Sequence, residues 1–174
     1  MSGFDRSLSR LIITEEDRMQ IVTCLQRLMT DSGASYCMVI DRSGQVLAWE
    51  SDQERPEMTY LGALIAATYA STQEMARILK EDGFKTLLQE GLKERVYTET
   101  IRDRWLLVVI FDQQSQVGLV KVLARRESIV LTGVLQLSQE RGDHPDAQRF
   151  RRIGKATTDT IDLIFKDNGC SDDE

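Results

Sequence analysis

The chain is poor in the residues from which catalytic and metal centres are most often built. It has one histidine, His144, beside Pro145 in a charged stretch, and three cysteines, Cys24, Cys37 and Cys170. No two cysteines have CxxC spacing, and an odd number gives no disulfide framework, as suits a reducing cytoplasm. P-loop, GxGxxG and HExxH motifs are also absent. We therefore expect no metal, no cofactor and no enzyme in its own right.

A basic surplus and a long apolar run are also missing. The formal charge is −6, from 22 basic and 28 acidic residues, which disfavours nucleic acid as a partner. The nearest basic cluster, Lys121, Arg125 and Arg126, is expected at the solvated start of a helix. No stretch approaches the roughly 20 apolar residues of a membrane span, and the N-terminus does not resemble a signal peptide. We expect a soluble cytoplasmic protein without membrane insertion.

What the chain does have is a continuous apolar stretch, Trp105–Phe111, followed by Asp112 and then by Ser115–Val122, which is rich in valine and leucine. This pattern predicts two neighbouring strands joined by a polar turn. Because seven consecutive positions of the first strand are apolar, both of its faces should be buried. Such a strand needs helices on both sides of the sheet, or a partner that covers one face.

The first half of the chain predicts a helix, a hairpin and a long helix. Thr14 is expected to cap a helix that ends at Gly33. The strands 36–40 and 45–49 flank the turn Asp41-Arg42-Ser43-Gly44, and a long helix runs from Pro56 to about Glu81. The stripe predicted to meet the sheet comprises Leu61, Leu64, Ile65, Thr68, Met75 and Leu79.

Small residues run along the flank of that stripe: Gly62, Ala63, Ala66, Ala67 and Ala70. They allow either close packing of the helix on its own sheet or close approach of a second helix. We favour the second helix, because the exposed side of this long helix carries few charges before Glu74.

The second half predicts a helical or irregular linker over 84–91 and a strand over 96–101 with one solvated face. Beyond Arg126, Ile129, Val130, Val134 and Leu137 repeat at helical spacing and predict a helix. Residues 141–156 are expected to be a linker. The amphipathic stretch 157–166 then either folds back on its own domain or docks on a partner, and the sequence does not decide between them.

The predicted fold class is therefore α/β (α+β): helix, two strands, long helix, three strands, helix. Five strands form one antiparallel sheet between helices, with the long helix on one face and the two terminal helices on the other. The domain spans 14–140, between an N-terminal arm (1–13) and a C-terminal linker with an amphipathic helix and an acidic tail (141–174). Asp41 and Asp112 each follow a strand at a turn, where aspartate commonly caps its own backbone.

This element order resembles the roadblock (dynein light chain) family, and within it the bacterial MglB type. The motifs that carry the resemblance are Asp41-Arg42-Ser43-Gly44-Gln45, Gln89-Glu90-Gly91, and Leu107–Asp112 followed by Gly118–Lys121. Outside the domain, Ile161–Phe165 resembles the C-terminal amphipathic segment of MglB proteins. One departure is that Ala67-Thr68 stands where MglB proteins carry Gly-Asn.

The resemblance implies a homodimer in which the long helices and the adjacent edge strands pair across a two-fold axis, giving a ten-stranded sheet. Each dimer is implied to bind one small Ras-like GTPase of the MglA type and to accelerate GTP hydrolysis in the control of cell polarity or motility. It donates no catalytic residue but stabilises the arginine and glutamine of the GTPase. The alternatives are a scaffold that localises a GTPase or motor without changing hydrolysis, and a small-molecule sensor of PAS-like or profilin-like shape.

The resemblance and the helix pattern together place the binding residues. The predicted GTPase-binding residues are Ala66, Ala67, Thr68, Tyr69, Ser71, Thr72, Gln73, Ile161, Asp162, Ile164 and Phe165. The predicted dimer-interface residues are Gly62, Ala63, Ala70, Val96, Tyr97, Thr98, Glu99 and Thr100.

Overall fold

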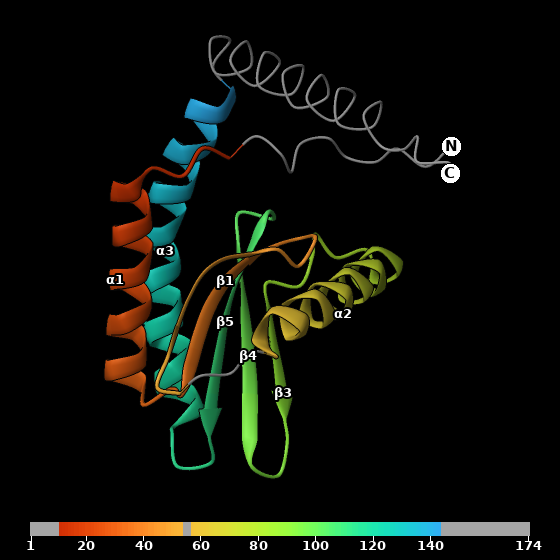
Figure 1. Ribbon diagram of the computed structural model, residues 1–174. Helices are drawn as coiled ribbons and strands as arrows, with labels where there is room; N and C mark the ends of the chain where they lie inside the picture. Colours follow the sequence, from red (N-terminus) through yellow and green to blue (C-terminus); the bar gives the residue numbers. More distant parts are fainter. Residues whose placement is uncertain (1–10, 54–56, 144–174) are drawn as a thin grey trace, which may run out of the picture.

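The computed structural model describes residues 11–53 and 57–143 (Figure 1). The elements follow the predicted order of helix, two strands, helix, three strands and helix. They are α1 (Glu15–Ser32), β1 (Tyr36–Asp41), β2 (Val46–Ser51), α2 (Met58–Leu79), β3 (Thr86–Glu90), β4 (Glu94–Ile101), β5 (Trp105–Asp112) and α3 (Val117–Asp143).

The five strands form one antiparallel sheet in the order β2-β1-β5-β4-β3. Helices α1 and α3 cover one face and α2 lies on the other, so each face has its own apolar core (Figure 1). The central strand is β5, and every residue of Trp105–Phe111 is buried. The prediction of a strand buried on both faces between helices is confirmed.

The second strand predicted at Ser115–Val122 is wrong, because α3 begins at Val117. Asp112 ends β5, and its Oδ1 accepts hydrogen bonds from the backbone N–H groups of Gln114 and Ser115, which turns the chain. From there Val120, Leu123 and Ala124 are buried at helical spacing. A short apolar run does not by itself distinguish a buried strand from the first turns of a buried helix.

The remaining strand of the sheet, β3, was not predicted. It lies within residues 84–91, which the sequence predicted to be a linker. Among the described strands it pairs with β4 alone and so lies at the edge of the sheet, and of its five residues Leu87 and Leu88 are partly buried, so its apolar pattern is weak. The strand predicted over 96–101 lies in β4 and is interior, because β3 pairs along one side and β5 along the other. Its expected position at the edge of the sheet is therefore wrong.

The predicted solvated face of that strand is also wrong. Glu99 is buried, and its carboxylate accepts hydrogen bonds from the Tyr97 hydroxyl (2.9 Å) and from Arg125 Nη1 on α3 (3.1 Å). Burial and the adjacent carboxylate raise the pKa of Tyr97 well above its usual range. The strand has no solvated face, because Tyr97, Glu99 and Ile101 lie beneath α3, where the Glu99 carboxylate is hydrogen-bonded, and Val96 and Thr100 lie beneath α2.

Both ends of α1 follow the prediction. Thr14 and Asp17 form a capping box: the Thr14 hydroxyl accepts from the Asp17 N–H, and the Asp17 carboxylate accepts from the Thr14 N–H (2.9 Å). Gly33 ends the helix in the left-handed conformation, at φ 70°. On the side of the helix that faces the sheet, Ile21, Leu25 and Leu28 are buried and Met29 is partly buried.

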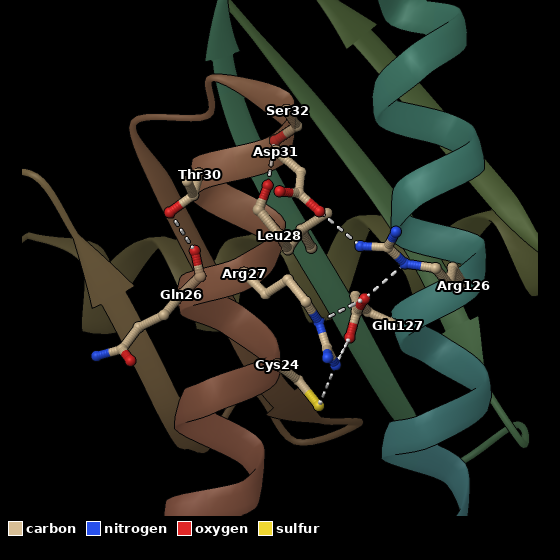
Figure 2. Close-up of polar contacts among 9 residues, drawn as sticks. All are labelled: Cys24, Gln26, Arg27, Leu28, Thr30, Asp31, Ser32, Arg126 and Glu127. Carbon is tan, nitrogen blue, oxygen red and sulfur yellow. Dashed lines mark hydrogen bonds and ion pairs between the residues drawn. The ribbon is translucent and has the colours of Figure 1, made fainter.

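The long outer helix α3 packs antiparallel against α1 and is joined to it by ion pairs at both ends. At the first end, Arg126 Nη2 lies 2.7 Å from Asp31 Oδ2, and Arg27 Nη2 lies 2.7 Å from Glu127 Oε2 (Figure 2). Burial alone would raise the pKa of Glu127, but the hydrogen bonds from Arg27 and Arg126 outweigh it and lower the pKa. The buried carboxylate therefore stays charged and links the two helices.

At the other end, Arg141 forms two 2.7 Å hydrogen bonds with the carboxylate of Asp17. Helix α3 extends through Asp143, so its last turn includes residues 141–143, which were predicted to begin the linker. Residues 11–13 precede the cap, and the Ile12 N–H donates to the Ser138 carbonyl, so this part of the expected arm lies against α3.

Replacing Arg141 with glutamine should lower the melting temperature near neutral pH, with a difference from wild type that becomes smaller in acid. The Arg141 guanidinium holds the pKa of Asp17 well below its ordinary value of 3.8, so the ion pair contributes stability fully above that value. The contribution is lost as the pH falls toward the lower pKa of the folded state. Thermal melts of both proteins from neutral pH down to about pH 2 measure this convergence.

The matched control is Arg77→Gln, which breaks an exposed ion pair with Glu74 on α2. Exposed pairs contribute little, so this change should have a much smaller effect at every pH. Equal effects of the two substitutions, or a difference for Arg141→Gln that grows in acid, would contradict the proposed role of Asp17.

Candidate interaction surface on α2

Helix α2 packs on the sheet through a different stripe from the one predicted. The buried residues are Met58, Gly62, Ile65, Ala66, Tyr69, Thr72 and Ala76. The prediction is correct for Ile65, and Leu61 and Thr68 are partly buried, but Leu64, Met75 and Leu79 are exposed. Compared with the prediction, the helix is rotated about its own axis. The small residues Gly62 and Ala66 face the sheet and let the helix backbone come close to it.

The closest approach lies between Gly62 and the β1–β2 turn. A side chain at Gly62 would meet the Gly44 carbonyl oxygen at 3.1 Å and Val46 at 3.3 Å. On the other side of this contact, Gly44 has a φ of 86° and lies against the backbone of Ala63. The simpler explanation of the small residues, packing on the chain's own sheet, is therefore correct for Gly62 and Ala66.

The second half of α2 is fixed to the sheet by polar contacts. Thr100 Oγ1 on β4 lies 2.8 Å from the Tyr69 hydroxyl, which in turn donates to the Phe84 carbonyl. Gln73 Nε2 donates to the same carbonyl at 3.0 Å. Residues on the outer side of this half are therefore presented on a rigid support.

The outer side of α2 is apolar, and none of the residues that the structure describes covers it. Tyr60 is 72% exposed, Leu64 50% and Ile78 68%, and Met75 and Leu79 are also exposed. Between them lie Ala63, Ala67, Ala70 and Ser71. Its charged pair, Glu74 and Arg77, is neutralised by a mutual ion pair. A continuous apolar face of this kind is typical of a protein–protein interface.

This fold and surface agree with a sequence match over residues 21–111 to the Roadblock/LC7 domain. The chain belongs to the Roadblock/LC7 domain family. No curated protein sequence matches significantly.

Solved structures place the roadblock chain near MglB proteins. It is 29% identical to the gliding protein MglB of Thermus thermophilus, covering 72% of this chain and 96% of that one, with a TM-score of 0.69. It is 28% identical to MglB of Myxococcus xanthus, covering 67% and 95%, with a TM-score of 0.65. A third MglB, described as having a tetrameric arrangement, is 27% identical, covering 74% and 96%, with a TM-score of 0.70.

Within the roadblock domain, the predicted GTPase-binding residues divide between the two sides of α2. Ala67 and Ser71 are exposed, and Thr68 and Gln73 are half-buried. The side chains of Ala66, Tyr69 and Thr72 are buried against the sheet. The remaining members of this set, Ile161, Asp162, Ile164 and Phe165, lie outside the described residues.

The predicted dimer residues are also divided. Ala63 and Ala70 lie on the outer side of α2, whereas Gly62 faces the β1–β2 turn. On β4, Tyr97, Thr98 and Glu99 are buried, and Val96 and Thr100 are half-buried beneath α2. Sequence reasoning missed the outward Tyr60, Leu64, Met75 and Ile78, because it placed two of them in the inward stripe. A helical wheel with Gly62 facing inward would have identified them.

The part of the chain that the structure describes has no helix long and apolar enough to cross a bilayer. In the same residues, no three His, Cys, Asp or Glu side chains form a group able to hold a metal ion. The two cysteines within it, Cys24 and Cys37, are free and buried, and burial raises the pKa of each thiol.

Proposed function

We propose that this roadblock chain forms a homodimer that activates a small Ras-like GTPase of the MglA type in the cytoplasm. The observation that carries the proposal is the exposed apolar face of α2, held on a rigid sheet, in a chain whose structural neighbours are MglB proteins. We further propose that the pair acts in cell polarity or motility.

The dimer is proposed to form through α2 and the edge strand β3. Because β4 is interior, β3 replaces residues 96–101 as the strand that pairs across the two-fold axis. Its second edge has no strand partner among the described residues, and an uncovered edge is a liability that pairing removes. Two sheets joined in this way would form ten continuous strands, with the exposed sides of the two α2 helices brought together.

The GTPase is proposed to contact the exposed or half-buried residues Ala67, Thr68, Ser71 and Gln73. These side chains are small or uncharged, so they offer surface complementarity rather than a catalytic acid, base or arginine. Activation would then come from preferential binding of the hydrolysis-competent conformation of the GTPase, whose own arginine and glutamine act on the nucleotide. Residues Ile161, Asp162, Ile164 and Phe165 are proposed as a second contact with the same GTPase.

GTP turnover by an MglA-type GTPase, with and without the full-length protein, tests this proposal. We expect phosphate release in single turnover to rise at least about tenfold, since a preorganised transition-state environment supplies factors of this size or larger. Binding should also be stronger to the GTP-bound than to the GDP-bound form. Binding with unchanged turnover would identify a localising scaffold instead, and the absence of both effects would reject the proposal.

A further inference from the structure

The outer side of α3 carries a second apolar face, on the opposite side of the sheet from α2. Ile129 and Val122 are each 67% exposed, and Leu119, Val130 and Leu137 also face outward. Val122, Ile129 and Leu137 follow one another along the helix at intervals close to two turns. Among the residues that the structure describes, none covers this stripe. A helix of a folded domain that exposes such a stripe has the pattern of a helix-packing surface.

Gly133 lies in the middle of the stripe, one turn after Ile129. A side chain added at Gly133 would meet nothing within 4 Å, so the glycine is not required by packing within the chain. A glycine inside a helix also costs stability relative to alanine. What the glycine does provide is open space on the helix surface beside the exposed Ile129.

The apolar surface continues from α3 onto α1. A shallow cavity of about 370 Å³ lies along α1 at its contact with α3, and Met19, Cys24 and Val130 line it together with the polar residues Glu16, Gln20, Thr23 and Arg27. Met19 is itself exposed. The surface is rigid, because the Arg27–Glu127 and Arg126–Asp31 pairs bind the two helices together (Figure 2). A preorganised surface loses little conformational freedom on binding.

Charge is distributed unevenly along this surface. Lys121, Arg125 and Arg126 lie on the first half of α3, and each arginine stays about half exposed or more despite its internal ion pair. Glu140 lies near the other end of α3. Glu15 and Glu16, in the first turn of α1, lie close to it, because Arg141 binds Asp17 beside them. One end of the surface is therefore basic and the other acidic.

We propose that the α1–α3 face binds the same face of a second copy of this chain, with the two α3 helices antiparallel. A two-fold axis close to Ile129 and Gly133 places the Ile129 side chain of each copy on Gly133 of the other. It also sets the basic end of each α1–α3 face against the acidic end of the same face in its partner. In an isologous contact the same surface of both copies meets itself, so its charges must complement each other when one copy is turned around. A surface that is basic at one end and acidic at the other meets this requirement.

This contact is independent of the dimer proposed through α2 and β3, because the sheet separates the two surfaces (Figure 1). A chain that uses both contacts assembles beyond a dimer, into four copies if the two axes close the assembly.

Sedimentation velocity and light scattering of the full-length protein over a range of concentrations test the proposal. Ile129→Glu places a charge in the contact, and Gly133→Leu fills the open space. We expect each substitution to halve the mass of the assembly. Gly133→Leu should leave the melting temperature of the chain unchanged or raise it, because its site is open in the single chain and a helical glycine is removed. Leu64→Glu, on the outer side of α2, is the counterpart of Ile129→Glu. It places the same charge in the proposed α2–β3 dimer contact.

If Gly133→Leu lowers the mass and Leu64→Glu does not, the α1–α3 contact stands and the proposed α2–β3 dimer fails. If Ile129→Glu and Gly133→Leu both keep the wild-type mass, or if the wild type is monomeric throughout, the α1–α3 contact is rejected. The face would then belong to a different protein or to residues 157–166 of the same chain.

Discussion

Replacing Gly44 with alanine should lower the free energy of unfolding by about 3 kcal/mol, from left-handed strain and overpacking together. Gly44 closes the β1–β2 turn with a φ of 86°, a conformation that costs energy for any residue with a side chain. A methyl group there would also lie 2.5 Å from Ala63 Cα and 2.9 Å from the Ala63 nitrogen. Both are atoms of the α2 backbone, so the helix itself must move. Urea denaturation followed by circular dichroism measures the loss.

Gly118→Ala is the matched control for this prediction. Gly118 lies in the first turn of α3, is exposed, and has nothing within 4 Å of an added methyl group. Alanine is the better helix former, so this substitution should leave stability unchanged or raise it by up to about 1 kcal/mol. A Gly44→Ala protein as stable as wild type would show that the hairpin and α2 separate easily, and that Gly62 and Gly44 do not set the position of the helix.

The elements that sequence predicted correctly are those whose local signals agree with their tertiary environment. Thr14 and Gly33 bound α1 because a capping box and a left-handed glycine act within a single turn of backbone. The turn after Asp41 was predictable for the same reason, since Asp41 Oδ1 accepts from the backbone N–H groups of Ser43 and Gln45. Seven consecutive apolar residues in β5 identified the central strand, because few positions other than the middle of a sheet between helices can bury them.

The errors occurred where the deciding contacts are distant in sequence. Strand β3 is held by pairing with β4, and its own residues Thr86–Glu90 carry little apolar pattern. The rotation of α2 depends on Gly62 meeting the β1–β2 turn, which composition along the helix does not reveal. The sequence predicts a solvated Glu99, because Arg125, which donates a hydrogen bond to its carboxylate from α3, is 26 residues away in the chain. At the candidate site, the sequence therefore predicted that α2 is a helix, but it did not predict which residues of α2 face the sheet and which face outward.

Replacing Ala67 with arginine should abolish acceleration of GTP hydrolysis while leaving the roadblock domain folded. Ala67 is exposed on α2, so a longer side chain is accommodated in the free protein. At the proposed contact, however, the guanidinium would be buried without a partner, which typically costs about 3 kcal/mol or roughly a hundredfold in affinity. Titration of the GTP-bound GTPase, followed by single-turnover phosphate release, measures the affinity and the rate separately.

Thr30→Arg is the matched control, because it adds the same charge and bulk at an exposed position of α1, on the other face of the sheet. It should leave turnover unchanged. The mass of the Ala67→Arg protein then decides how the residue acts. An unchanged mass with lost activation places Ala67 against the GTPase, whereas a lowered mass of the assembly places it in the contact between the two α2 helices. Full activation by Ala67→Arg would remove this part of α2 from the GTPase-binding surface. The activator would then have to use the ends of the helix, where Tyr60, Leu64, Met75 and Ile78 supply the larger apolar side chains.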